Sequence, residues 1–304
     1  MIVLHPDGKV IWSNAHARRI FAETPDAIVP HVEEAFAGHE IHDRRVTIAT
    51  DRRRMVLELT AAPLGGSSGG VAVAVEDVTQ RDRAEQADAE FVQNAAHQLR
   101  NPMTAIASSV AALNAGARDE PAERDRFLAY IGRESERMGS LVDALLTLAA
   151  LQRGDVPPRI EVVPLRGLLE DAADAAPGRG GHATVDCGQD IAVVTDRALL
   201  AQAVANVVAN AVDYARSNVS IVGRIEGATA VVDIRDDGPG IPPEDREHVF
   251  ERFFRGADVQ RTGSGLGLAI ARAAAEAAQS TLELLPPDGP GTTFRFTIPG
   301  AELL

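Results

Sequence analysis

The segment over residues 81–154 constrains the fold most, because its apolar residues recur with the spacing of an amphipathic helix along most of its length. We predict one helix over about 81–114 and a second over about 121–153, where Gly154 ends the pattern. At about 1.5 Å per residue, each helix is roughly 50 Å long. The connection between them is short, so we expect an antiparallel hairpin. One hairpin offers too little surface to bury both apolar stripes, which predicts a homodimer that forms a four-helix bundle.

The regions on either side of this hairpin have mixed patterns. In residues 1–80, short apolar runs bounded by turn residues predict a helix over 15–22 and strands at 2–4, 10–12, 46–48, 55–60 and 71–75. In residues 155–304, the patterns predict helices over 199–214 and 266–278 and strands at 191–194, 219–222, 229–233, 281–285 and 293–298. We therefore expect a multidomain α+β protein with domains at 1–80, 81–154 and 155–304, the last an α/β sandwich.

Composition excludes several classes of protein and of site. The formal net charge of −14 argues against a nucleic-acid-binding protein, which needs a basic face. The single cysteine, Cys187, excludes an intramolecular disulfide and a cysteine-rich zinc site. Apolar runs fall short of the roughly 18 residues that a transmembrane helix needs. We therefore expect a cytoplasmic protein, associated with a membrane only if a segment upstream of this sequence anchors it.

His97 is the candidate reactive residue of the first predicted helix. Helical spacing places it on an outward polar stripe, with Leu99 on the opposite side. The stripe comprises Gln93, His97, Arg100, Asn101, Thr104 and Ser108. Pro102 removes a hydrogen bond from this helix and is expected to bend it. A neutral imidazole is a competent nucleophile near pH 7. The alternative is an ordinary surface histidine on an amphipathic helix.

Three segments of the C-terminal region suit a ligand that carries phosphates. Asn206 and Asn210 stand four apart on a helix of Ala, Val and Leu, where amides buried without partners are unfavourable. The glycine-rich segment 263–268 opens a helix, whose free N–H groups and positive dipole end attract phosphate. The glycines of segment 236–242 permit close approach of a ligand. Each segment also has a plain structural alternative. Asn206 and Asn210 alone fit capping or network residues, and segment 236–242 alone fits a tight turn. A single glycine-rich string such as 263–268 is a weak signal of phosphate binding.

The string FVQNAAHQLRNPMTAI at 91–106 resembles the phosphoacceptor box of two-component sensor histidine kinases. The segments 199–215, 236–242, 249–256 and 263–268 and the closing Gly291–Phe294 resemble, in the same order, the motifs of the GHKL-type ATP-binding fold in that family. The resemblance covers residues about 77–300. It implies autophosphorylation of His97 by ATP, transfer of the phosphate to an aspartate of a response-regulator receiver domain, and a phosphatase activity in which Asn101 positions water.

The same resemblance implies the residues of the nucleotide site. Asn210 would coordinate a Mg²⁺ that bridges the phosphates, with Asn206 in support. Tyr214 would pack on adenine, and Asp236 would accept a hydrogen bond from the adenine amino group. Arg255, which borders a mobile lid in the family, would reach the phosphates. The remaining positions expected to contact the nucleotide are Gly238, Gly240, Gly263, Gly265, Leu266, Gly267 and Thr292.

Two positions depart from the family pattern. Gln98 stands where Glu or Asp usually follows the histidine, and an amide cannot take a proton at neutral pH. We therefore expect slow or differently assisted autophosphorylation. Asp213 stands where Lys is common. One alternative is a degenerate nucleotide-binding sensor or scaffold without efficient kinase activity. Another is a GHKL ATPase of the chaperone or topoisomerase type, which would have a catalytic Glu in place of Asn206 and would lack the histidine box.

Residues 1–76 resemble a PAS-type sensor domain. The likeness rests on PDGKVIWSN at 6–14 and on the strand at 71–79, which ends in Asp-Val-Thr. The alternative is a linker or dimerisation domain without a ligand. A sheet that leads directly into the first long helix would pass a shift or rotation to His97.

Overall fold

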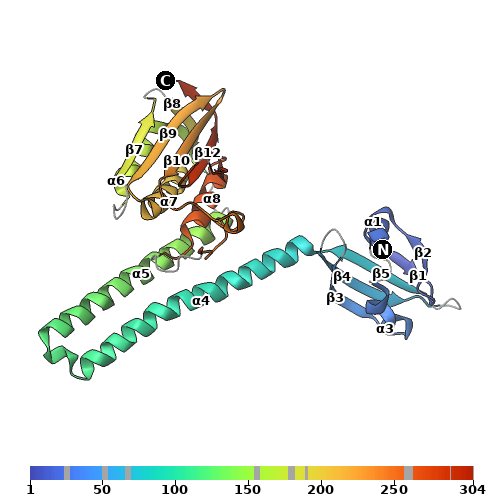
Figure 1. Ribbon diagram of the computed structural model, residues 1–304. Coiled ribbons are helices and arrows are strands. Elements are labelled where there is room, and N and C mark those ends of the chain that lie inside the picture. Colours follow the sequence, from blue (N-terminus) through green and yellow to red (C-terminus); the bar gives the residue numbers. More distant parts are fainter. Residues whose placement is uncertain are drawn as a thin grey trace. The chain divides into compact units, whose positions relative to one another are not determined.

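The computed structural model describes residues 1–23, 28–49, 54–65, 70–153, 158–176, 182–188, 191–256, 263–287 and 289–303. The chain divides into two compact units, Met1–Gln93 and Asn94–Leu304 (Figure 1). Gly154, predicted to end the second long helix, lies outside the described residues. Among the helices within these ranges, none is both long and apolar enough to cross a membrane.

The N-terminal unit is built around a five-stranded antiparallel sheet in the order β2-β1-β5-β4-β3. Its strands are β1 (Ile2–Leu4), β2 (Val10–Ser13), β3 (Ile41–Ala49), β4 (Arg54–Pro63) and β5 (Val71–Asp77). Its helices are α1 (Ala15–Glu23), the 3-10 turn η1 (Val29–Val32) and α3 (Glu33–Phe36). The predicted strands and the predicted helix near 15–22 are confirmed. The sequence pattern does not predict α3, because four residues are too few to show a helical period.

A β-bulge around Asp43 keeps the apolar residues of β3 on one face. The pairing of β3 with β4 shifts by one residue between Ile41 and Arg44. Ile41 and Val46 are both buried, although side chains an odd number of positions apart in a regular strand face opposite sides. The extra residue of the bulge corrects this mismatch. Asp43 adopts a φ of 48°, in the left-handed region that aspartate tolerates better than most residues.

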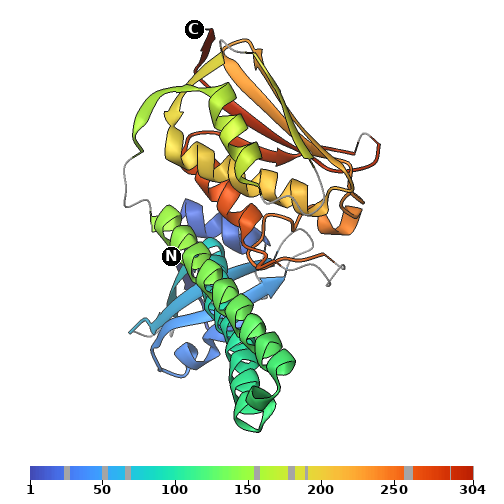
Figure 2. The same cartoon turned by 90° about the vertical axis from the view of Figure 1, so that its left-hand side faces the viewer.

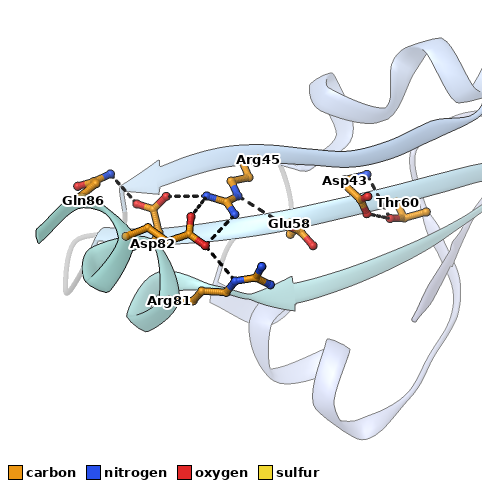
Figure 3. Close-up of polar contacts among 8 residues, drawn as sticks. Asp43, Arg45, Glu58, Thr60, Arg81, Asp82 and Gln86 are labelled. Carbon is orange, nitrogen blue, oxygen red and sulfur yellow. Dashed lines mark hydrogen bonds and ion pairs between the residues drawn. The ribbon is translucent and has the colours of Figure 1, made fainter. Parts of the chain in front are cut away.

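Arg45 ties β3 to the start of the long helix α4 (Thr79–Asn114), as Figure 3 shows. It stands opposite Glu58 on β4, and its Nε lies 3.5 Å from the Glu58 carboxylate. One terminal nitrogen of the guanidinium lies 3.5 Å from Asp82 and 2.7 Å from Glu85. We call Arg45, Glu58, Asp82 and Glu85 the junction cluster. These ion pairs hold the first two turns of α4 against the sheet.

The boundary between β5 and α4 is also fixed by hydrogen bonds to β4. The Val56 N–H donates to the Thr79 hydroxyl oxygen over 2.9 Å, and the Thr79 hydroxyl donates to Asp77 over 2.5 Å. The Val78 N–H donates to the Val56 carbonyl over 2.9 Å. The chain therefore enters α4 with its backbone anchored on both sides of the boundary.

The two predicted long helices are α4 and α5 (Pro121–Arg153), joined through the 3-10 turn η2 (Ala117–Asp119). They run in opposite directions (Figure 1), which confirms the predicted hairpin. Few of their described side chains are buried: Pro102 and Ser109 in α4, and Leu141 and Leu148 in α5. Large apolar side chains stay exposed along both helices, namely Val92, Met103, Val110, Leu128, Tyr130, Val142 and Leu146.

The C-terminal part of the chain is an α/β sandwich with two sheets, in the orders β11-β12-β10-β9-β7 and β13-β8-β6. Its strands are β6 (Ile160–Pro164), β7 (His182–Cys187), β8 (Ile191–Asp196), β9 (Asn218–Glu226), β10 (Thr229–Asp236), β11 (Thr281–Leu284), β12 (Thr293–Pro299) and β13 (Ala301–Leu303). Its helices are α6 (Leu165–Ala175), α7 (Arg197–Tyr214) and α8 (Gly267–Ala277), with a 3-10 turn at Pro243–Asp245 (η3). Strand β7 pairs with β9 in parallel.

The core of this sandwich lies between the three helices and the sheets, and the smaller sheet contributes Val163, Ile191, Val193 and Ala301 to it. Figure 2 shows the helices beside the strands of the larger sheet. Val207 and Val208 of α7 are fully buried, as are Phe296 of β12 and Ala274 of α8. The sequence pattern does not predict β6, β7 and β13, which are all edge strands. β6 and β7 each bury a single residue, so neither shows a clear alternation of apolar and polar positions. The pattern also does not predict α6, although the buried Leu165, Leu168, Leu169 and Ala172 carry a helical spacing.

Candidate active site

His97 lies on α4, with its side chain exposed to solvent. Asn101, one turn further along, is exposed as well, whereas Gln98 and Leu99 are half-buried. The other members of the predicted polar stripe are also exposed: Gln93, Arg100, Thr104 and Ser108. Pro102 is buried within a helix that continues to Asn114, so the missing hydrogen bond does not end α4. An exposed imidazole on a long helix can meet a reactive group on another domain or molecule.

Asp236 ends β10 and is only 3% exposed. Its Oδ1 accepts hydrogen bonds from the N–H of Gly238 over 2.8 Å and of Thr292 over 3.3 Å. Burial raises the pKa of this carboxyl, and the hydrogen bonds from Gly238 and Thr292 offset part of that rise. A carboxylate held this deeply by two backbone donors presents a fixed acceptor to a ligand.

The backbones around Asp236 pack so closely that two glycines are required. At Gly291, with φ of 96°, a Cβ atom would overlap the Asp236 carbonyl oxygen. At Gly238, a Cβ atom would lie 2.5 Å from the Tyr214 carbonyl oxygen. The segment after β10, the end of α7 and the loop before β12 therefore meet backbone to backbone. Gly240 belongs to the same meeting point, beside the Gly291 carbonyl oxygen.

Helix α7 carries Asn206, Asn210 and Tyr214 at intervals of four residues, so they share one face of the helix. All three are half-buried. The Asn206 amide nitrogen donates to the Gln202 carbonyl over 2.8 Å. The helix itself thus satisfies one donor of Asn206, so this amide does not require a ligand at that atom.

The Asn206 side chain also marks where α7 approaches the start of α8. A Cβ atom on Gly267 would lie 3.5 Å from the Asn206 oxygen. Leu266, directly before α8, is fully buried. The N-terminal end of α8 therefore lies next to the asparagine face of α7, where backbone N–H groups and the helix dipole favour an anion.

The glycine-rich turn before α8 packs against the segment 249–256. The Phe253 N–H donates to the Gly265 carbonyl over 2.8 Å, and a Cβ atom on Gly265 would lie 2.7 Å from the Phe253 carbonyl carbon. Gly263 is exposed, and Arg255 is half-buried. Residues 257–262, which contain the remainder of the expected lid, lie outside the described residues.

The structure thus places the expected site residues in two groups. His97, Gln98 and Asn101 lie on α4. The others lie in the sandwich, where Asp236, Gly238, Gly240, Tyr214 and Thr292 surround one point and Asn206 and Gly267 meet at another. Helix α7 connects the two points, with Asn210 between them.

Two protein families match this chain. The His Kinase A (phospho-acceptor) domain matches residues 87–154, and the Histidine kinase-, DNA gyrase B-, and HSP90-like ATPase matches residues 195–302. The sensor protein SphS of Synechococcus elongatus is 32% identical over 320 residues, with 92% of this chain and 76% of SphS covered. This chain belongs to the two-component sensor histidine kinases. The sheet of the N-terminal unit lies outside both matched ranges, so its likeness to a PAS domain stays a prediction.

Other relatives cover less of their own length. The sensor-like histidine kinase SenX3 of Mycobacterium tuberculosis is 36% identical over 236 residues, which are 75% of this chain and 57% of SenX3. This chain therefore spans little more than half of SenX3. The solved structure of histidine kinase ThkA in complex with the response regulator protein TrrA has the same fold, with a TM-score of 0.56 and 20% identity over 98% of this chain and 95% of that chain.

The described residues of the sandwich fit an adenine nucleotide. The buried Asp236 carboxylate, held by the N–H groups of Gly238 and Thr292, is the right acceptor for an amino group. At Gly263, a Cβ atom would meet nothing within 4 Å, so the backbone there is open to close approach. The start of α8 suits phosphates. Asn210 supplies an amide oxygen, a ligand type that Mg²⁺ accepts.

Proposed function

We propose that this chain is an ATP-dependent protein histidine kinase that phosphorylates itself on His97. The observation that carries the proposal is the exposed His97 on α4, inside the segment that matches the phospho-acceptor family and on the same chain as an ATPase-type domain. One imidazole nitrogen attacks the terminal phosphorus of ATP, a nitrogen–phosphorus bond forms, and the bond to the oxygen that leaves with ADP breaks. The phosphoryl group then passes to an aspartate of a response-regulator receiver domain.

In the nucleotide site, Asp236 accepts the adenine amino group, Tyr214 packs on the ring, and the start of α8 holds phosphates. We assign this phosphate side to Gly263, Gly265, Leu266 and Gly267, with Arg255 reaching it from the neighbouring segment, and the adenine side to Gly238, Gly240 and Thr292. Asn210, supported by Asn206, holds Mg²⁺, which when bound neutralises charge on the phosphates. Asn101 orients the water that removes phosphate from the regulator.

Gln98 sets the rate of the first step in this proposal. Its amide can accept a hydrogen bond from the imidazole but cannot take a proton, so His97 is activated less than in relatives with a carboxylate there. The variant Gln98→Glu should therefore phosphorylate itself faster, by about tenfold or more. An unchanged or lower rate would contradict this role for Gln98.

We also propose that the chain acts as a homodimer whose α4 and α5 helices form a four-helix bundle. The support is the set of large apolar side chains that a single hairpin leaves in water, such as Met103 at 57%, Leu128 at 53% and Leu146 at 64% exposure. A bundle would bury such side chains between hairpins. Sedimentation of the full chain should give the mass of a dimer.

We propose that the N-terminal unit is a PAS-like sensor. The five-stranded antiparallel sheet with short helices, and a last strand that leads directly into the kinase helix α4, support this assignment. In that role, a change in the sheet reaches His97 along α4, because the junction cluster ties the two together.

Incubation of the full chain with γ-labelled ATP and Mg²⁺ tests the kinase proposal. We expect a label on the wild-type chain that is labile to acid and stable to base, as a phosphohistidine is. The control variant His97→Gln should stay unlabelled. A wild-type chain that binds ATP but takes up no label would favour a nucleotide-binding scaffold, and label on His97→Gln would place the acceptor elsewhere.

A further inference from the structure

We propose that Asp237 is a positioning residue for the nucleotide site. Asp237 holds the end of α7 against the segment 236–242, which follows β10, and does not itself touch the nucleotide. The inference rests on the proposed ATP-binding function. Asp237 follows Asp236 directly, yet the two carboxylates face different partners. Asp236 is buried, whereas Asp237 is partly exposed.

Asp237 binds the three-residue connection between α7, which ends at Tyr214, and β9, which begins at Asn218. Its Oδ1 accepts hydrogen bonds from the N–H of Arg216 over 2.8 Å and of Ser217 over 3.1 Å. Its Oδ2 accepts a hydrogen bond from the Ser217 hydroxyl over 2.6 Å. Both oxygens are therefore occupied by the connection. One side chain fixes two successive backbone N–H groups and one hydroxyl, which leaves little freedom for this connection.

The connection has to be held in place because of what lies beside it. The Tyr214 carbonyl oxygen lies against Gly238, where a Cβ atom would come within 2.5 Å. Gly238 in turn donates its N–H to Asp236. A shift of residues 215–217 would therefore move the Tyr214 backbone and, through Gly238, the Asp236 carboxylate. The hydrogen bonds from Ser217 also lower the pKa of Asp237 below its ordinary value, as expected for a carboxylate that accepts several hydrogen bonds.

The atoms involved predict how different substitutions of Asp237 behave. In Asp237→Ala, all three hydrogen bonds are lost. In Asp237→Asn, the amide oxygen replaces Oδ1 as acceptor for both backbone N–H groups, and the amide nitrogen donates to the Ser217 hydroxyl oxygen. In Ser217→Ala, only the bond to Oδ2 is lost. A positioning role therefore predicts a large effect for alanine and a small one for asparagine, even though both remove the charge.

The test measures autophosphorylation of the full chain against ATP concentration. We expect Asp237→Ala to raise the KM for ATP about tenfold, with the rate at saturating ATP nearly unchanged, because lost positioning weakens nucleotide binding. Asp237→Asn and Ser217→Ala should each raise KM less than about threefold. The matched control is Asp186→Ala, an exposed aspartate on β7 of the same domain, which should leave KM unchanged.

Three outcomes would overturn the proposal. A KM of Asp237→Ala equal to that of the wild type would show that the nucleotide site does not depend on the hydrogen bonds between Asp237 and the connection. An equal rise for Asp237→Asn and Asp237→Ala would show that the charge acts on the nucleotide or its metal directly. If Asp237→Ala does not fold, the double variant Asp237→Asn with Ser217→Ala is compared with the two single variants. Additive effects on KM would contradict a joint action of Asp237 and Ser217, whereas non-additive effects would support it. A wild-type chain that binds no ATP would instead defeat the proposed function.

Discussion

The junction between β5 and α4 and the proposed nucleotide site of the sandwich are held together by different kinds of contact. At the junction, Arg45 reaches carboxylates on a neighbouring strand and on the helix through a long, partly exposed side chain. At the proposed nucleotide site, backbone atoms of three separate segments meet directly, so closely that Gly291 and Gly238 have no room for a Cβ atom.

The two kinds of contact differ in how much free energy a change of shape requires. Ion pairs between partly exposed groups contribute little to stability and weaken as salt screens them. They can therefore break and re-form when a sheet moves. Close backbone packing has no alternative arrangement of similar energy, because every shift creates an overlap or a void. The contrast fits an ion-pair contact between Arg45 and α4 that can open, beside hydrogen bonds that anchor the start of α4 to β4, and a preorganised proposed nucleotide site. Four substitutions test it.

The largest effect is expected for Gly291→Ala. The new Cβ atom would overlap the Asp236 carbonyl oxygen, and the φ of 96° is unfavourable for alanine. We expect a loss of more than about 3 kcal/mol of stability in the sandwich domain, together with the loss of ATP binding. Urea unfolding and ATP titration measure both. The control Gly139→Ala, in the middle of α5 with open space around it, should be neutral or stabilising. An ATP affinity in Gly291→Ala equal to that of the wild type would contradict close packing at this point.

The next largest effect is expected for Asp233→Asn, on β10 of the sandwich. Asp233 accepts hydrogen bonds from Arg224 over 2.6 Å and from Arg295 over 2.6 and 2.8 Å. The substitution removes the charge between two guanidinium groups, so we expect a loss of about 1–2 kcal/mol in urea unfolding at pH 7. The control Asp186→Ala, on the exposed side of β7, should change little.

The same carboxylate predicts a pH dependence. Burial acts to raise the pKa of Asp233, but the hydrogen bonds from Arg295 and Arg224 outweigh it, and the pKa lies below its ordinary value of 3.8. Its stabilising contribution is therefore complete above that value and is lost as the pH falls through the lowered pKa. Asp233→Asn should lose less stability than the wild type on acidification. Parallel pH curves for the two proteins would contradict this assignment.

A smaller effect is expected for Thr79→Val at the junction. The substitution leaves the Val56 N–H without its hydroxyl acceptor, which should cost about 1 kcal/mol in the N-terminal unit. Thr79→Ser keeps the hydroxyl and is the matched control. Hydrogen exchange at Val56 reports the change locally, and we expect faster exchange in Thr79→Val alone. Equal exchange in both variants would show that the hydroxyl does not anchor this boundary.

The smallest effect on stability is expected for Arg45→Gln. The guanidinium lowers the pKa of Glu85, but the groups are exposed enough for salt to screen them. The melting temperature should fall slightly at low salt, and the difference from the wild type should vanish in 1 M NaCl, where the Debye length is about 3 Å. Arg83→Gln, at an exposed position of α4, is the control. A large difference that persists at high salt would mean that the junction is as rigid as the nucleotide site.

Much of the fold follows from local patterns in the sequence. The two long helices, most inner strands and the outward face of His97 are predicted from periodicity, because each depends on which side of one element is apolar. The motifs around Asp236 and Gly265 predict a nucleotide site only through their ordered resemblance to the GHKL-type fold, because each motif alone also fits a plain turn.

Other features depend on residues that are distant in the sequence, and periodicity within one element cannot predict them. The bulge at Asp43 changes which residue of β3 faces Glu58, and so decides that Arg45 can reach α4. The parallel pairing of β7 with β9 likewise depends on the tertiary structure, because β8 and α7 separate the two strands in the sequence.

Asp236 and Asp237 show most clearly the difference between features that follow from local sequence patterns and features that depend on distant residues. The residue pattern alone shows two adjacent carboxylates that follow a predicted strand and precede a glycine-rich turn. Folding buries Asp236, which raises its pKa, and brings Asp237 to the connection after α7, whose hydrogen bonds lower its pKa. The reason is that successive residues at a strand end point in different directions, and what each meets is set by segments far away in the chain.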